Sequence, residues 1–316
     1  DNVVEYVKAK ADANERLHRA KVTDNARVIL ALTAIGKDVT NVGGHNLLKG
    51  LDNMAYVQKQ GINGPIFTLI ALDSHNYPTM GDVTREKLIQ VILDAQLSDG
   101  GWNLSGENAD PDMTAMAIQA LAPYYENAQV KAAVDAALTF LAGAQNDDAT
   151  FSEIPGTDAS AESTAQVIVA LTALGIDPTA DSRFVKSGVS VVDALCGFYV
   201  TGGGFRHLMA DKTVDGMATE QGYYALAAYY RLLAQKTSLY DMSDVTVTVT
   251  VTGGRVTGVE IDASGETPEL GGTAAEALAA ALLKTGSTAG VDAVSGSTMT
   301  SQAIFTAMDD CLSQAE

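Results

Sequence analysis

The chain has 316 residues, 47% of them hydrophobic, which suits one large or two ordinary globular domains with real cores. Its formal net charge of −19 argues against nucleic acid as a partner, because that affinity rests on Lys and Arg neutralising phosphates. No run of about eighteen apolar residues occurs, so we expect no membrane span within this chain.

The N-terminal part reads as a repeat of helices rich in Ala and Leu. Amphipathic helices are expected at residues 2–17 and 23–36, and the pattern of the second helix returns four times. Its closing Ala-Leu pairs end at Leu32, Leu72, Leu121, Leu171 and Leu226, so the intervals are 40, 49, 50 and 55 residues. A period of about 50 residues indicates one helical hairpin per repeat.

Bulkier amphipathic segments separate the Ala-rich helices. They are expected as outer helices at residues 47–58, 84–96, 128–144 and 184–199. Small side chains allow close packing, so we expect the Ala-rich helices at the centre of the domain and the bulkier helices around them.

Similar turns lead from outer to inner helices. Residues 96–102 read Gln-Leu-Ser-Asp-Gly-Gly-Trp, residues 145–151 hold the equivalent place 49 positions on, and residues 199–205 are a weaker third copy. These turns resemble the prenyltransferase and squalene-cyclase repeat. The resemblance implies an α/α toroid over residues 1–243, in which Gln caps a helix end, Gly makes the turn and the aromatic residue is buried. Five hairpins are clear and a closed barrel has six, so closure stays open.

The toroid offers few candidates for chemistry of its own. Asp110-Pro111-Asp112 comes nearest to the Asp-x-Asp-Asp acid of polyprenyl cyclases, but a helix N-cap with a first-turn acid explains it better. The histidines are scattered and Cys196 and Cys311 have no metal-ligand spacing, so no catalytic residue or metal site is predicted. The histidines are His18, His45, His75 and His207.

The tyrosines of the last inner helix have two explanations. Tyr223, Tyr224, Tyr229 and Tyr230 could line a pocket or pack in a core. Vitamin B12 carriers also join an α/α toroid to a β-rich module, so a ligand-binding toroid remains an alternative.

The C-terminal part changes character. Val and Thr alternate strictly over residues 245–252, Gly253-Gly254 supplies a two-residue hairpin turn, and a second strand is expected over residues 255–262. A constrained loop follows at residues 266–272, and a capping box at 273–276 predicts a helix to about residue 284. The chain is therefore expected to be mainly α, with a toroid of five to six hairpins followed by a small α+β domain at residues 244–316.

A hydroxyl-rich turn precedes the last helix. Residues 292–301 read Asp-Ala-Val-Ser-Gly-Ser-Thr-Met-Thr-Ser and run into a helix that carries Ile304 and Met308. The free N–H groups at a helix N-terminus favour an anion such as a phosphate. A bare helix cap is the plainer explanation, since such ends commonly begin with Ser or Thr.

Taken with the strands before it, this turn resembles the FMN-binding domain of flavinylated proteins such as the C subunit of sodium-pumping NADH:quinone oxidoreductase. The family motif is Asp-x-x-Ser/Thr-Gly-Ala-Thr/Ser. The resemblance implies that a flavin transferase joins FMN to Thr298 through a phosphodiester. It makes Asp292, Ser295 and Gly296 the recognition positions, with Ser297 standing where the family prefers Ala.

The loop before the first C-terminal helix is expected to be a second contact of the flavin. Its glycines would allow the backbone to approach the ring closely. The residues expected there are Thr267, Pro268, Glu269, Leu270 and Gly271.

The expected function is that of an extracellular or cell-surface electron-transfer flavoprotein, a redox carrier rather than a turnover enzyme, with an unknown redox partner. One alternative is a binding protein that holds a cobalamin-like or isoprenoid ligand in the toroid. The other is an unmodified structural surface module.

Overall fold

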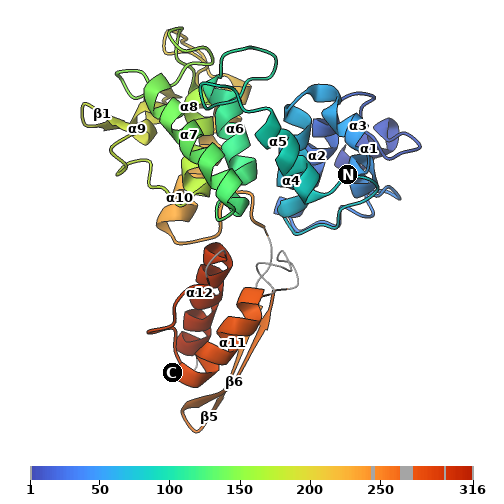
Figure 1. The fold of residues 1–316 in the computed structure, drawn as a ribbon, viewed down its shortest axis with the longest axis vertical. Coiled ribbons are helices and arrows are strands. Elements are labelled where there is room, and N and C mark those ends of the chain that lie inside the picture. Colours follow the sequence, from blue (N-terminus) through green and yellow to red (C-terminus); the bar gives the residue numbers. More distant parts are fainter. Residues whose placement is uncertain (1, 243–245, 264–272, 295–296, 315–316) are drawn as a thin grey trace.

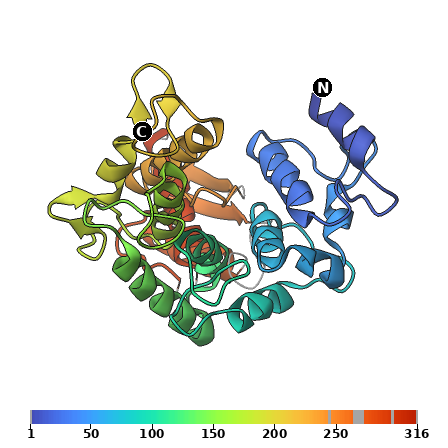
Figure 2. The same cartoon turned by 90° about the horizontal axis from the view of Figure 1, so that it is seen from above.

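Five inner helices form the centre of the larger part of the molecule (Figure 1). The computed structural model describes residues 2–242, 246–263, 273–294 and 297–314. The inner helices are α2 (Val22–Ala34), α4 (Asn63–Asp73), α6 (Pro111–Leu121), α8 (Ala161–Ala173) and α10 (Gly216–Leu233). Each packs against the next, and Figure 2 shows them following an arc that ends with α10. The predicted repeat of inner helices is thus confirmed.

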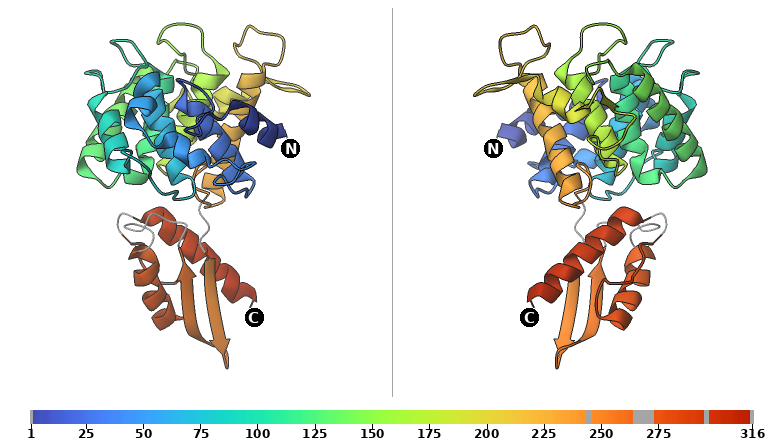
Figure 3. Two further views of the ribbon diagram at one scale, coloured as in Figure 1. Left: turned by 90° about the vertical axis from the view of Figure 1, so that its right-hand side faces the viewer. Right: turned by 90° about the vertical axis from the view of Figure 1, so that its left-hand side faces the viewer.

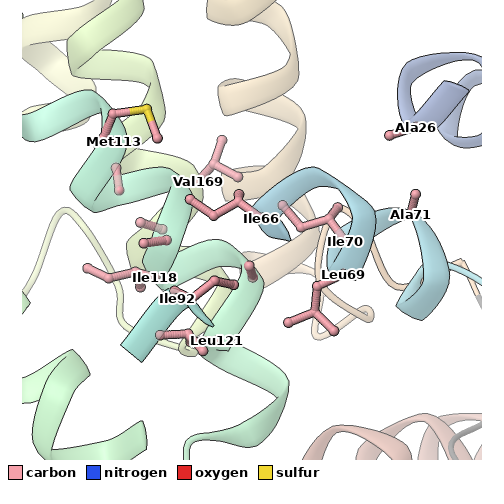
Figure 4. Close-up of a cluster of buried hydrophobic side chains, with 14 of the residues drawn as sticks. Ala26, Ile66, Leu69, Ile70, Ala71, Ile92, Met113, Ile118, Leu121 and Val169 are labelled. Atoms are coloured by element: carbon pink, nitrogen blue, oxygen red, sulfur yellow. The ribbon is translucent and has the colours of Figure 1, made fainter. Parts of the chain in front are cut away.

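Apolar side chains of neighbouring inner helices make one continuous core. Ile66 of α4, Ile118 of α6 and Val169 of α8 are all buried, and Figure 4 shows them gathered between their helices. Thr114 and Ser163 are buried beside Ala115 and Ala165, so small residues let these helices approach closely.

The outer helices differ more from their predictions. The helix predicted at 128–144 is present with the same bounds, whereas the segment predicted as one helix at 47–58 is broken into three short pieces. Asn46 and Asn53 each accept a backbone N–H two or three residues on, so the helix restarts instead of continuing. The helices other than the inner ones are, in chain order, α1 (Asn2–Lys10), η1 (Leu47–Leu51), α3 (Met54–Val57), η2 (Gln58–Gln60), α5 (Arg85–Asp94), η3 (Ala122–Tyr124), α7 (Ala128–Ala144) and α9 (Val191–Cys196).

The helix predicted over residues 184–199 is wrong in its first half. Strands β1 (Val185–Lys186) and β2 (Val189–Ser190) pair there, because Ser187 and Gly188 both take positive φ and make a tight hairpin turn. Only α9 is helical, and it is opened by a capping box between Ser190 and Asp193. The Ser187-Gly188 pair therefore forms a hairpin turn where the amphipathic pattern predicted a continuous helix.

Each of the three turns between outer and inner helices makes the same kind of hydrogen bond, from a backbone N–H of the turn to a Thr hydroxyl of the following inner helix. The backbone N–H of Trp102 donates to Thr114 Oγ1 at 2.9 Å, and Phe151 donates to Thr164 at 3.1 Å. In the third turn, which pairs β3 (Tyr199–Val200) with β4 (Gly204–Phe205), the N–H of Phe205 donates to Thr219 Oγ1 at 3.0 Å. The weak third copy therefore shares this hydrogen bond, although Tyr199 stands where the other two turns have Gln.

The glutamines of these turns do more than cap a helix end. Gln96 Nε2 donates to the carbonyls of Gly100 and Ala133, and Gln145 Nε2 donates to those of Ala149 and Phe184. Each amide thus links its own turn to the following repeat. The prediction that these glutamines only cap a helix end is therefore corrected.

A separate small domain follows the helical arc. Strands β5 (Thr246–Thr252) and β6 (Arg255–Asp262) form an antiparallel hairpin, against which α11 (Thr273–Thr285) and α12 (Thr298–Gln314) pack. A second core brings Val247 and Val259 of the strands together with Leu282 of α11 and Ile304 of α12. The molecule is mainly α with a small α+β domain, as predicted.

The segment after α10 crosses to the end of α4 before it enters the small domain. The N–H of Met242 donates to the Ser74 carbonyl at 2.8 Å, and His75 Nδ1 lies 3.1 Å from the Met242 carbonyl oxygen. The chain is therefore anchored to the helical domain four residues before the described part of the small domain begins.

Candidate functional site

The N-termini of α11 and α12 lie at the same end of the small domain, and this end faces the helical domain (Figures 1 and 3). The turn of the strand hairpin points the other way, so the end of β6 lies at the same end of the domain as the start of α11. Two helix N-termini side by side concentrate unpaired N–H groups and positive dipole ends. This end therefore favours an anionic group such as a phosphate.

A buried serine holds the turn before α12 in place. Ser301 Oγ accepts the N–H of Val294 at 3.0 Å and donates to the carbonyl of Ser297 at 2.8 Å. The N–H of Ser297 donates to Val294, which closes the turn on itself. Ser301 is fully buried in the first turn of α12. Its two hydrogen bonds therefore fix the turn that leads to Thr298.

Sequence reasoning assigned no role to Ser301. Its signal was present, since a serine four residues after Ser297 can bond back to that carbonyl within the first turn of a helix. Residues 295–301 hold five hydroxyl residues in seven positions, so the sequence alone does not tell which hydroxyl holds the turn and which one is exposed for modification.

The described residues contain part of the predicted flavin site. Asp292 is exposed on the turn, Ser297 is 6% exposed, and Thr298 is the first residue of α12. The remaining predicted positions lie outside the described residues, namely Ser295, Gly296, Thr267, Pro268, Glu269, Leu270 and Gly271. Ala263 and the start of α11 flank the predicted second loop, which places its two ends at the same end of the domain as Thr298.

These features fit a flavin mononucleotide. Its phosphate suits the paired helix N-termini, and α12 begins at Thr298, the residue that the motif marks as the expected acceptor. Ser297 is buried in the position where the flavin family prefers Ala, so a small side chain suits the packing there. When bound, FMN supplies redox chemistry that no amino-acid side chain provides.

Two neighbouring carboxyl groups at the start of α6 have raised pKa values. Asp110 caps α6 by accepting the N–H of Met113 at 2.7 Å, as predicted, and Asp112 lies in the first turn. Burial raises the pKa of each to about 6, and Glu153 adds to both shifts through its negative charge. Asp112 Oδ1 is buried and finds no hydrogen-bond partner among the described residues.

The histidines have separate roles in the described structure. His45 pairs with Glu15 at 2.6 Å and His207 pairs with Glu162 at 2.8 Å, which raises the pKa of His207. Cys196 and Cys311 are both free thiols. Within the described ranges, no three His, Cys, Asp or Glu side chains gather in a way that could hold a metal ion.

Polar side chains of three inner helices bond one another inside the arc. Gln119 Nε2 donates to Gln166 Oε1, and Gln166 Nε2 reaches Gln221 Oε1 and the hydroxyl of Tyr224. Burial raises the pKa of Tyr224, so this phenol stays neutral. A cavity of about 380 Å³ lies elsewhere, between α5 and α7, and includes Gln90 and Gln129 in its lining.

Comparison with protein families bears on both parts of the chain. A model of the FMN-binding domain matches residues 242–313, and a model of the prenyltransferase alpha-alpha toroid domain matches residues 17–201, which is more than half of the chain. No curated protein matches the chain. In the part that the structure describes, no helix has the length and apolar character needed to cross a membrane. The two matches confirm the resemblances seen in the turns of the repeat and in the hydroxyl-rich stretch.

Proposed function

The chain belongs to the prenyltransferase α/α toroid family and binds flavin through a C-terminal FMN-binding domain, and from this premise we propose that it is an extracellular electron carrier with FMN joined covalently to Thr298. The observation that carries the proposal is the position of Thr298 at the start of α12, behind a turn held by Ser301 and beside a second helix N-terminus.

Each part of this end has a distinct task in the proposal. The hydroxyl of Thr298 forms the ester bond, the N–H groups of the two helix ends bind phosphate oxygens, and Ser301 keeps the turn from moving. Asp292 is exposed, so a flavin transferase can reach it. The transferase is the expected partner for modification, and the redox partner is a second protein or molecule that meets the exposed flavin.

Covalent attachment matters most for a carrier at the cell surface. A dissociable cofactor would be lost by dilution outside the cell, whereas an esterified flavin stays with its protein. Electron carriage, and not turnover of a small substrate, then follows as the role.

Flavin fluorescence of denatured protein tests the attachment. The chain is produced together with a flavin transferase and run on a denaturing gel, where only covalent flavin survives. We expect a fluorescent band for the native chain and for Thr288→Ala, which removes another hydroxyl of the same domain, and none for Thr298→Ala. Fluorescence of Thr298→Ala equal to the native chain would overturn the assignment.

Carriage and location need their own measurements. The flavinylated chain should take up electrons anaerobically from dithionite and return them to an external acceptor with its flavin still attached. In the cells that make it, the chain should be labelled by a reagent that cannot cross membranes. A flavin that no external acceptor reoxidises would contradict electron carriage. A chain that the reagent does not label in intact cells would contradict the extracellular location.

A further inference from the structure

Exposed apolar side chains are concentrated in the last inner helix and the stretch of chain that leads into it. Among the described residues, fifteen large hydrophobic side chains are notably exposed, and seven of them belong to the short stretch 199–233. These seven, the α10 face, are Tyr199, Met209, Val214, Met217, Tyr223, Tyr230 and Leu233. Such a concentration differs from the scattered exposed apolar residues of ordinary surfaces and marks an interaction surface.

Aromatic packing holds one half of this face rigid. The ring of Phe205 is buried and meets Tyr199 and Tyr223 edge to face, with centroids 5.5 and 5.6 Å apart. Phe205 rests on Gly222 of α10, where a Cβ atom would come within 2.6 Å of the ring. The two exposed tyrosines therefore lose little conformational freedom when a partner covers them.

The other half of the face follows α10 itself. Tyr223 and Tyr230 are exposed at helical spacing, with Ala227 exposed between them, and Tyr230 is 63% exposed. Met217 is exposed in the first turn of the same helix. Glu220 is the one charged residue among the exposed positions of α10. Tyr and Met are enriched in the cores of protein interfaces, where charged residues are scarce.

The charge of this region points to a second copy of the same chain as the occupant. Residues 199–236 hold three acidic and four basic residues, whereas the whole chain carries a net charge of −19. Two molecules of such net charge repel each other overall, so a nearly neutral apolar face adds little to that repulsion when two copies meet. An uncharged face is also compatible with itself, as a two-fold interface requires.

We propose that the chain forms a two-fold dimer in which the α10 face of one copy packs against the α10 face of the other. Tyr223 and Tyr230 lie at the centre of the contact. Salt strengthens the dimer, because it screens the repulsion between the acidic molecules without weakening apolar burial.

Sedimentation velocity over a range of protein and salt concentrations tests the dimer on the full chain. The native chain should sediment as a dimer, more so at high salt. Tyr230→Glu should weaken dimerisation roughly 100-fold or more, because one substitution acts twice in a two-fold interface. Ile35→Glu adds the same charge at an exposed site outside the α10 face and should leave the dimer unchanged.

Two further variants separate loss of contact from added negative charge and from misfolding. Tyr230→Lys carries the opposite charge and should also dissociate the dimer, and Met217→Ser should weaken it without any charge. All variants should keep the native helix content by circular dichroism, since their side chains are exposed. A monomeric native chain at every concentration, or variants that dimerise as well as the native chain, would overturn the proposal.

Discussion

At the scale of single residues, Asp112 shows what burial costs. Its pKa is raised to about 6 from 3.8, and its Oδ1 atom has no partner among the described residues. A carboxyl whose pKa is raised by folding is penalised in its charged form. The folded state is therefore less stable by about 3 kcal/mol above pH 6 than it would be without the shift, and it regains this stability as the pH falls from about 6 to about 4.

We expect Asp112→Asn to stabilise the chain at neutral pH. The uncharged amide removes the penalty, so the melting temperature should rise at about pH 8 and match the native chain at about pH 4. Asp158→Asn, which changes an exposed carboxylate, should alter the melting temperature little at either pH. A variant less stable than the native chain at both pH values would show that the charge of Asp112 is not penalised.

Arg85 illustrates the opposite case of a compensated buried charge. Its Nε donates to Asp73 Oδ1 at 2.7 Å, the Tyr124 hydroxyl donates to the other oxygen at 2.8 Å, and both charged side chains are nearly buried. Arg85→Ala should cost about 3–5 kcal/mol in the free energy of unfolding, because Asp73 loses its partner. Arg183→Ala breaks a more exposed pair with Asp181 and should cost about 1 kcal/mol or less, as measured by urea unfolding. Equal losses in the two variants would contradict this account.

At the scale of elements, the hydroxyl of each turn is the repeated link between outer and inner helices. Thr164 is fully buried, accepts the N–H of Phe151 and donates to the Ser160 carbonyl at 2.8 Å. Thr164→Val keeps the shape but leaves that N–H unpaired, so we expect a loss of about 1–3 kcal/mol in urea unfolding. Thr139→Val on α7 removes an exposed hydroxyl that bonds only locally and should be nearly neutral. A Thr164→Val variant as stable as the native chain would mean that this hydrogen bond contributes nothing to the free energy of unfolding.

The sequence predicted elements well where one local rule dominates. Repeated Ala-Leu pairs identified the five inner helices, and Asn127 caps α7 where its prediction began. The failures at 47–58 and 184–199 occurred where Asn53 or Ser187-Gly188 changed the backbone direction inside an apolar pattern. Periodicity reports which side chains face inward, but a single cap or a positive φ decides whether the helix continues.

The candidate site was predictable only in part. Thr298 follows from a recognisable motif before a helix, whereas Ser301 acts through bonds to Val294 and Ser297 that appear only when the turn is folded. The shared location of the α11 and α12 ends also depends on how both helices pack against the β5–β6 hairpin, which no local pattern reports. Resemblance therefore pointed to Thr298 as the expected acceptor, and the structure added Ser301, which holds the turn before it.

At the scale of the whole molecule, the flavin domain itself is strongly acidic. Residues 244–316 carry ten acidic and two basic residues. Negative charge disfavours adding electrons to a bound flavin, so the reduction potential should be low in dilute buffer and rise as salt screens the field. A spectroelectrochemical titration at low and high salt measures this, with free FMN as the control for salt effects on flavin itself. A potential that shifts no more than that of free FMN would contradict the effect.

The most direct test of the central claim is the intact mass of the chain after production together with a flavin transferase. We expect the native chain to gain the mass of one FMN less one water, and Thr298→Ala to gain nothing. Peptide fragmentation of the native adduct should place the added mass on Thr298. A native chain without the adduct, or a Thr298→Ala variant that carries it equally, would contradict covalent flavinylation at this residue.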